Sequence, residues 1–164
     1  MTASTAPGVA TALASTHQSS SSVTLSWAEA PVDTGSAVTG YKVYDADGAL
    51  VYDGRGDTAT VTDRTTELND LEGGTTYTLL VGALSASGES DRSASVDIST
   101  CPSAPTALTS VSQTTTSMLL SWSAPAVTSG EGVTGYLVYR NDGDETAVDL
   151  SLIHISEPTR HLDI

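Results

Sequence analysis

The chain has 164 residues, of which 6 are Lys or Arg and 20 are Asp or Glu, and its formal net charge is −14. This charge disfavours nucleic acid and anionic membranes as partners, because both are bound through Lys and Arg that neutralise phosphate. No apolar run is long enough to span a membrane, so no membrane insertion is expected. Ser, Thr and Gly are abundant and Phe is absent, which favours strands and turns over helices.

The chain contains an internal repeat. Three anchors recur 95 residues later: Trp27 as Trp122, Gly40 as Gly135, and Tyr44 as Tyr139. A fixed offset indicates one structural unit written twice. We therefore expect a complete domain over residues 6–100, the first unit, and the N-terminal half of a copy over 102–149, the second unit. The single cysteine, Cys101, lies between them, so an intramolecular disulfide is impossible, and pairing with a residue outside this chain stays open.

Short stretches of alternating apolar and polar residues in the first unit predict half-buried strands. In chain order they lie around Leu13 and over residues 23–27, 38–44, 50–52, 58–62, 79–83 and 95–100. Thr65–Leu68 is expected to extend the fifth of these after a break. Gly-, Asp- and Pro-rich turns separate the strands, notably at 45–48 and 53–57. Seven short strands with turns between them predict an all-β sandwich.

The residues that anchor this pattern also resemble a known family. They are Pro7; Val23, Leu25 and Trp27; Pro31; Gly40, Tyr41, Val43 and Tyr44; Leu71, Thr75, Tyr77, Leu79, Val81 and Ala83; and Gly88. In this order and spacing they resemble a fibronectin type III domain, and residues 102–149 resemble the first half of another. The resemblance implies an immunoglobulin-like Greek-key β-sandwich in which the Tyr77 phenol bonds to the backbone near Leu71, a tyrosine corner. The expected structural core is Trp27, Tyr41, Leu71, Tyr77, Trp122 and Tyr136.

Residues 150–164 break the repeat. At the 95-residue offset, residues 150–160 should match the turn and Thr-rich strand of 55–65, yet they read LSLIHISEPTR. This string resembles a translated transposase sequencing adapter, so 150–164 is expected to be a non-native tail. His154 and His161 would then carry no functional information.

Arg55-Gly56-Asp57 matches the integrin-type tripeptide and lies in a predicted exposed turn. Integrin recognition requires an Arg and a carboxylate at opposite ends of a tight loop. A plain Gly/Asp hairpin turn explains the same residues and is favoured, and the second unit lacks the tripeptide at the equivalent place. Adhesion through this turn is therefore a secondary hypothesis.

Other candidate sites have simpler structural explanations. Asp45-Ala46-Asp47-Gly48 and Asn141-Asp142-Gly143-Asp144 resemble Ca²⁺ loops, but the distal bidentate Glu is missing and a hairpin turn is favoured. Tyr44 and Tyr52 are expected to face one another across a hairpin on the solvent side. A packing pair is preferred there to a platform for a sugar or peptide.

No nucleophile, base and orienting group can be assembled, and no metal or cofactor site is predicted. We therefore expect a non-enzymatic spacer or protein-interaction module from a larger surface or secreted protein, with other proteins or domains of the same chain as partners. The resemblance also implies an extracellular or cell-surface location. The alternatives are an accessory region of a secreted carbohydrate-active enzyme and, second, cell adhesion through Arg55-Gly56-Asp57. Carbohydrate binding has no specific support in the sequence.

Overall fold

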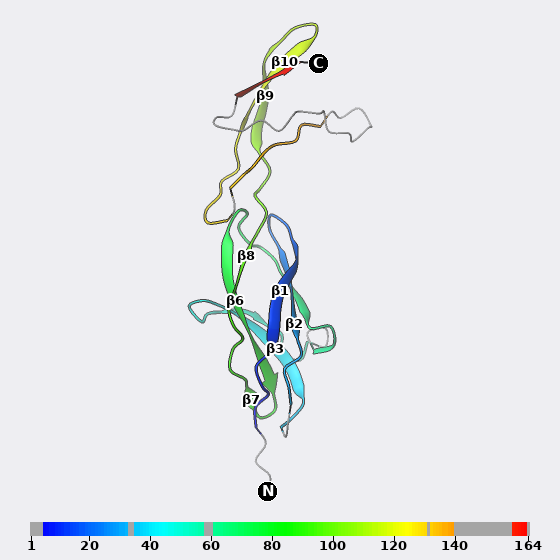
Figure 1. Cartoon of the computed structure of the whole chain (residues 1–164), viewed down its shortest axis with the longest axis vertical. Helices are drawn as coiled ribbons and strands as arrows, with labels where there is room; N and C mark the ends of the chain where they lie inside the picture. The colour runs from blue at the N-terminus through cyan, green and yellow to red at the C-terminus, as the bar shows by residue number, and fades with distance from the viewer. Residues whose placement is uncertain (1–4, 33–34, 58–60, 131, 140–158, 164) are drawn as a thin grey trace.

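The computed structural model describes residues 5–32, 35–57, 61–130, 132–139 and 159–163. The first unit consists of two antiparallel sheets (Figure 1). One sheet has the order β1-β2-β5, formed by Thr11–Gln18, Val23–Ala28 and Thr65–Leu68. The other has the order β4-β3-β6-β7, with β8 also paired to β6; its strands are β3 (Val38–Asp45), β4 (Leu50–Asp53), β6 (Thr76–Ser85), β7 (Gly88–Glu89) and β8 (Val96–Ser99). The predicted all-β sandwich is confirmed.

The core lies between the two sheets and follows directly from the alternation along β2. Val23, Leu25 and Trp27 are buried, whereas the intervening residues are half-buried. The Trp27 ring packs against Tyr41 of the facing sheet, with ring centroids 5.2 Å apart. Full burial of a side chain such as Val23 or Leu25 contributes roughly 1.5–3 kcal/mol to the free energy of folding. Burial along these alternating strands therefore fixes which face of each sheet points inward.

Two tyrosine hydroxyls tie loops to this core. The Tyr41 hydroxyl accepts a hydrogen bond from the Ala30 N–H at 3.1 Å, and both residues are about 1% exposed. The Tyr77 hydroxyl accepts one from the Glu72 N–H at 2.8 Å. Leu71 and Tyr77 are partly buried and pack against the core. The second bond is the arrangement that the tyrosine corner implies.

The strand predicted over residues 58–62 is wrong for the part that the structure describes. Val61 and Thr62 lie in a short helical turn, and residues 58–60 are outside the described residues. The strand is instead β5, which begins after Arg64, a residue with φ of 54°. β5 places Leu68 opposite Val23, and both side chains are buried. Core burial therefore overrides the weak local preference of a Thr-rich stretch.

Strands β7 and β8 both pair with β6 but are separated by an irregular stretch, where two serine hydroxyls complete the hydrogen bonding of β6. Between β7 and β8, the N–H groups of Ser90 and Ser93 donate to the carbonyls of Ala83 and Val81, both at 2.8 Å. In return, the N–H groups of Ala83 and Val81 donate to the Oγ atoms of these serines, both at 2.9 Å. The central strand β6 thus keeps its hydrogen bonds even where its neighbour leaves the regular ladder.

The second unit repeats the start of the first. β9 (Thr106–Gln113) and β10 (Ser117–Ser123) form a hairpin like β1 and β2. Trp122 is 7% exposed and packs against the half-buried Tyr136 at 5.3 Å. Ala12 and Ala107, 95 residues apart, have φ of 53° and 54°. The repeat thus extends to an unusual backbone conformation.

By the 95-residue repeat, residues 133–139 should form the counterpart of β3. Residues 132–139 form no strand, and among them only Tyr139 makes an isolated bridge. In the first unit the equivalent strand β3 pairs with β6 along most of its length. No described residue of the second unit offers such a partner. Residues 140–149 and 150–158 lie outside the described residues, whereas Thr159–Asp163 forms β11 antiparallel to β10. The non-native origin of residues 150–164 remains a prediction.

Candidate functional site

The Arg55-Gly56-Asp57 turn is built by the backbone around it. The Gly54 and Gly56 N–H groups donate to the carbonyls of Tyr41 and Thr39 at 2.9 and 3.2 Å, which fasten the turn to β3. The Arg55 N–H donates to Asp53 Oδ1 at 3.1 Å. Gly56 has φ of 75°, a left-handed conformation that favours glycine.

The two charged groups of this tripeptide are presented differently. Arg55 is exposed, whereas Asp57 is half-buried and its carboxylate accepts a hydrogen bond from the Tyr52 hydroxyl. This hydrogen bond raises the pKa of Tyr52, and burial raises it further. The carboxylate is therefore engaged inside the fold, which gives no support to presentation of the tripeptide to an integrin.

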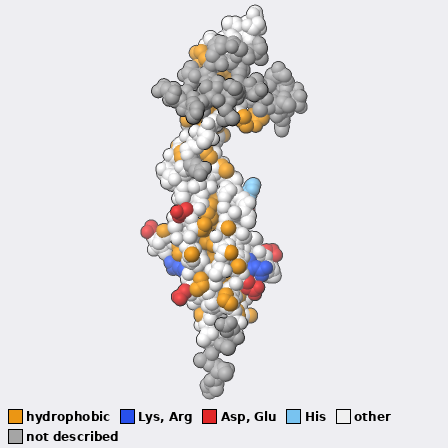
Figure 2. Space-filling view, in the orientation of Figure 1, with side chains coloured by type: hydrophobic (Ala, Val, Ile, Leu, Met, Phe, Trp, Pro, Cys, Tyr) orange, Lys and Arg blue, Asp and Glu red, His pale blue; other side chains and the backbone are white. Residues whose placement is uncertain are grey.

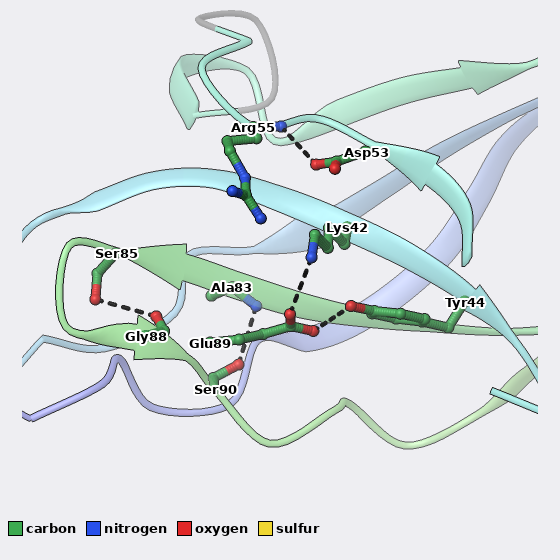
Figure 3. Close-up of polar contacts among 9 residues, drawn as sticks. All are labelled: Lys42, Tyr44, Asp53, Arg55, Ala83, Ser85, Gly88, Glu89 and Ser90. Atoms are coloured by element: carbon green, nitrogen blue, oxygen red, sulfur yellow. Dashed lines mark hydrogen bonds and ion pairs between the residues drawn. The ribbon is translucent and has the colours of Figure 1, made fainter. Parts of the chain in front are cut away.

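A polar cluster lies beside the turn on the outer face of the same sheet (Figure 3). Glu89 of β7 accepts hydrogen bonds from Lys42 Nζ at 3.2 Å and from the Tyr44 hydroxyl. Burial lowers the pKa of Lys42, but the hydrogen bond and negative charge of Glu89 outweigh it and raise this pKa above its ordinary value. The pKa of Tyr44 is raised by burial and by the same carboxylate. Glu89 thus fastens edge strand β7 to β3, across β6.

Tyr44 is covered rather than presented to solvent. It is 6% exposed, and the guanidinium carbon of Arg92 lies 3.8 Å from its ring centroid, a cation–π contact. The expected solvent-side pairing with Tyr52 is wrong. A register shift between Val43 and Tyr44 places Tyr52 opposite Val43, where it packs against the core, and Leu50 opposite Tyr44. These rings therefore form no open platform for a sugar.

Arg55 borders a shallow hollow on this face. Figure 3 shows its side chain extending across β3, on the side of the sheet that carries Lys42 and Glu89. The hollow is lined by Thr39, Arg55, Leu84, Ser85, Ala86, Gly88 and Glu89. Its hydroxyls are used internally, since Thr39 Oγ1 and Ser85 Oγ donate to the carbonyls of Leu84 and Gly88. Figure 2 shows one face of the first unit, on which basic side chains lie close to acidic ones. The face drawn there therefore has no large region of one charge.

The described part of the chain contains no group of three or more His, Cys, Asp or Glu residues placed to hold a metal ion. Asp45 instead completes a hairpin turn, with its Oδ1 accepting from the Ala49 N–H at 2.8 Å and Gly48 at φ of 85°. The loop at 141–144 lies outside the described residues. His17 is exposed on β1, and Cys101 is an exposed free thiol.

Sequence reasoning did not single out Glu89, Arg92, Ser90 or Ser93. Their roles depend on which side chains the sheet brings together from distant positions, and one sequence carries no direct signal for that.

The two-sheet sandwich with a buried tryptophan and a tyrosine corner defines the class of protein. Residues 6–99 match the family described as fibronectin type III domain, and the chain belongs to this family. A two-domain fibronectin type III segment of chicken tenascin shares the fold, with 19% identity, a TM-score of 0.50, and coverage of 94% of this chain and 82% of that one.

Two curated relatives are more similar in sequence. Chitinase A1 of Niallia circulans is 38% identical over 154 residues, covering 88% of this chain and 20% of that protein. Exoglucanase B of Cellulomonas fimi is 33% identical over 144 residues, covering 83% of this chain and 13% of that protein. The chain therefore spans a fifth or less of either relative. In the ranges that the structure describes, no helix has both the length and the apolar character to cross a membrane.

Proposed function

We propose that this chain is a non-catalytic spacer and domain-interaction region of an extracellular enzyme that degrades a polysaccharide. The observation that carries the proposal is the similarity to a chitinase at 38% identity, confined to a fifth of that enzyme's length. A repeated β-sandwich that occupies so small a share of an enzyme is suited to positioning other domains. Its partners are then domains of the same polypeptide, and the polysaccharide is bound and cleaved elsewhere.

The local chemistry agrees with this role. Glu89, the carboxylate of the polar cluster, is paired with Lys42 at 3.2 Å and serves to join strands. Catalysis by paired carboxylates requires an acid and a base or nucleophile facing one substrate bond. The cluster has one carboxylate, engaged by its neighbours, so it supports a structural role.

The test uses the complete enzyme that contains this chain. Residues 6–139 are replaced by a Gly/Ser linker of equal residue number, which behaves as a flexible coil. We expect turnover of a soluble oligosaccharide to stay within about twofold, because the catalytic domain is intact, and hydrolysis of the insoluble polymer to fall several-fold, because loosely tethered domains lose effective concentration at the surface. Loss of soluble-substrate turnover would contradict the proposal, and so would unchanged hydrolysis of the polymer.

A further inference from the structure

The two units meet through a specific set of hydrogen bonds beyond the covalent link. We propose that residues 72–76 of the first unit, the junction turn, are a docking surface for residues 126–130 of the second, the junction loop. Docking fixes the direction in which the second unit leaves the first. The inference rests on the proposed spacer function, since it supplies the stiffness that such a spacer needs.

The centre of the contact is the carbonyl of Gly74. It accepts hydrogen bonds from three successive N–H groups of the junction loop, those of Thr128 at 3.0 Å, Ser129 at 3.3 Å and Gly130 at 2.9 Å. Successive amides converging on one oxygen form a concave backbone nest that favours a partial negative charge. Gly74 is buried, so the nest encloses an oxygen that solvent does not reach freely.

A second pair of bonds fixes the loop sideways. The Thr76 N–H donates to Ser129 Oγ, and Thr76 Oγ1 donates to the Ser129 carbonyl, both at 2.9 Å. Thr76 is the first residue of β6, the strand that pairs with β3 along the sheet. The contact is therefore anchored to the most extensively paired strand of the first unit. One bond would permit rotation about itself, whereas two bonds beside the nest define an orientation.

The segment that links the two units is hydrogen-bonded to the first unit as far as Cys101. The Thr100 N–H donates to the Thr75 carbonyl at 3.0 Å, and Thr100 is 3% exposed. Cys101 continues the pattern, with its N–H donating to the Ser19 carbonyl at 2.9 Å and its carbonyl accepting from the Gly74 N–H at 3.0 Å. The following residues include Pro102 and Pro105, which restrict the backbone further. Little freely rotating chain is left between the units.

Glycines at the contact are required by close approach. A Cβ added at Gly130 would lie 2.9 Å from the carbonyl carbon and oxygen of Gly74, and one at Gly73 would lie 2.4 Å from Ser103 Oγ. Gly74 has φ of 66°, which also favours glycine. By contrast, a Cβ at Gly132 would meet nothing within 4 Å. Gly132 is therefore a matched control two residues from the interface.

The experiment compares the full chain with its G130A and G132A variants by amide hydrogen exchange, resolved residue by residue by NMR. In the unaltered chain, the amides of Thr128, Ser129 and Gly130 should exchange at least about tenfold more slowly than free-peptide rates, since bonded amides exchange only through local opening. Gly130→Ala should abolish the protection of Thr128 and Ser129 while the amides of β2 and β6 stay protected. Gly132→Ala should leave all of them unchanged.

Free-peptide exchange of the three amides in the unaltered chain would overturn the inference, as would retained protection in the Gly130→Ala chain. This outcome is separable from that of the proposed function. The exchange experiment involves no enzyme, so the docked junction can be present even if replacing the segment leaves polymer hydrolysis unchanged. Equally, hydrolysis can depend on the segment if the junction proves open.

Discussion

Two tyrosine hydroxyls perform the same chemistry in different surroundings, which allows a paired prediction. Tyr41→Phe removes the acceptor of the Ala30 N–H, and Ala30 is 1% exposed. A buried donor left without a partner costs about 1–3 kcal/mol. Tyr77→Phe removes the acceptor of the Glu72 N–H, but Glu72 is exposed and water can replace the hydroxyl. The expected cost there is about 0.5–1.5 kcal/mol.

Equilibrium denaturation of each variant, with the slope m unchanged, gives the loss in the free energy of unfolding. For a domain of this size, 1 kcal/mol corresponds to about 4–8 °C in Tm. The Tyr41→Phe variant should therefore melt clearly below the Tyr77→Phe variant. If Tyr77→Phe proves equally or more destabilising, the reasoning from burial and hydrogen-bond satisfaction is refuted.

Three further predictions concern the sheet face, the tripeptide and the thiol. The raised pKa of Tyr44 favours the neutral phenol in the folded state, so the contribution of this phenol to stability is complete below about pH 10 and is lost as pH rises through the folded pKa. In an ultraviolet titration, the Glu89→Gln variant should therefore ionise Tyr44 at a lower pH than the unaltered chain does. An unshifted titration curve would contradict the role given to the Glu89 carboxylate. Cell attachment to the immobilised Asp57→Glu variant should equal attachment to the unaltered chain, because the native Asp57 carboxylate already accepts a hydrogen bond from Tyr52. Reduced attachment to the variant would support the adhesion hypothesis. Cys101 is exposed and should react with a thiol reagent without denaturant, whereas a protected thiol would show that the junction covers it.

The fold was predictable where burial imposes a period. The alternation of Val23, Leu25 and Trp27 can be satisfied only with one face inward, and the structure buries these three side chains. The Thr-rich stretch after Asp57 has no such constraint. There the residues that pair with β2 are Thr65–Leu68, and a local pattern does not encode that pairing.

Side-chain partnerships were less predictable than strands. A one-residue register shift in the β3–β4 hairpin moved Tyr52 to the core side and separated it from Tyr44. The Glu89 cluster joins residues 45 or more positions apart. The serine hydroxyls at 90 and 93 replace backbone acceptors between β7 and β8, in a stretch that has no alternating pattern of its own. Each of these depends on tertiary geometry and not on local residue preference.

The central claim is that the two units form one stiff spacer. It is tested most directly by pulsed electron–electron double resonance, which measures the distance between two spin labels. The labels are attached at Val51→Cys in β4 and Leu108→Cys in β9, both exposed positions, in a Cys101→Ser background. A docked junction predicts one narrow distance distribution that broadens when Gly130→Ala is added. A broad distribution in the chain with its junction intact would contradict the claim.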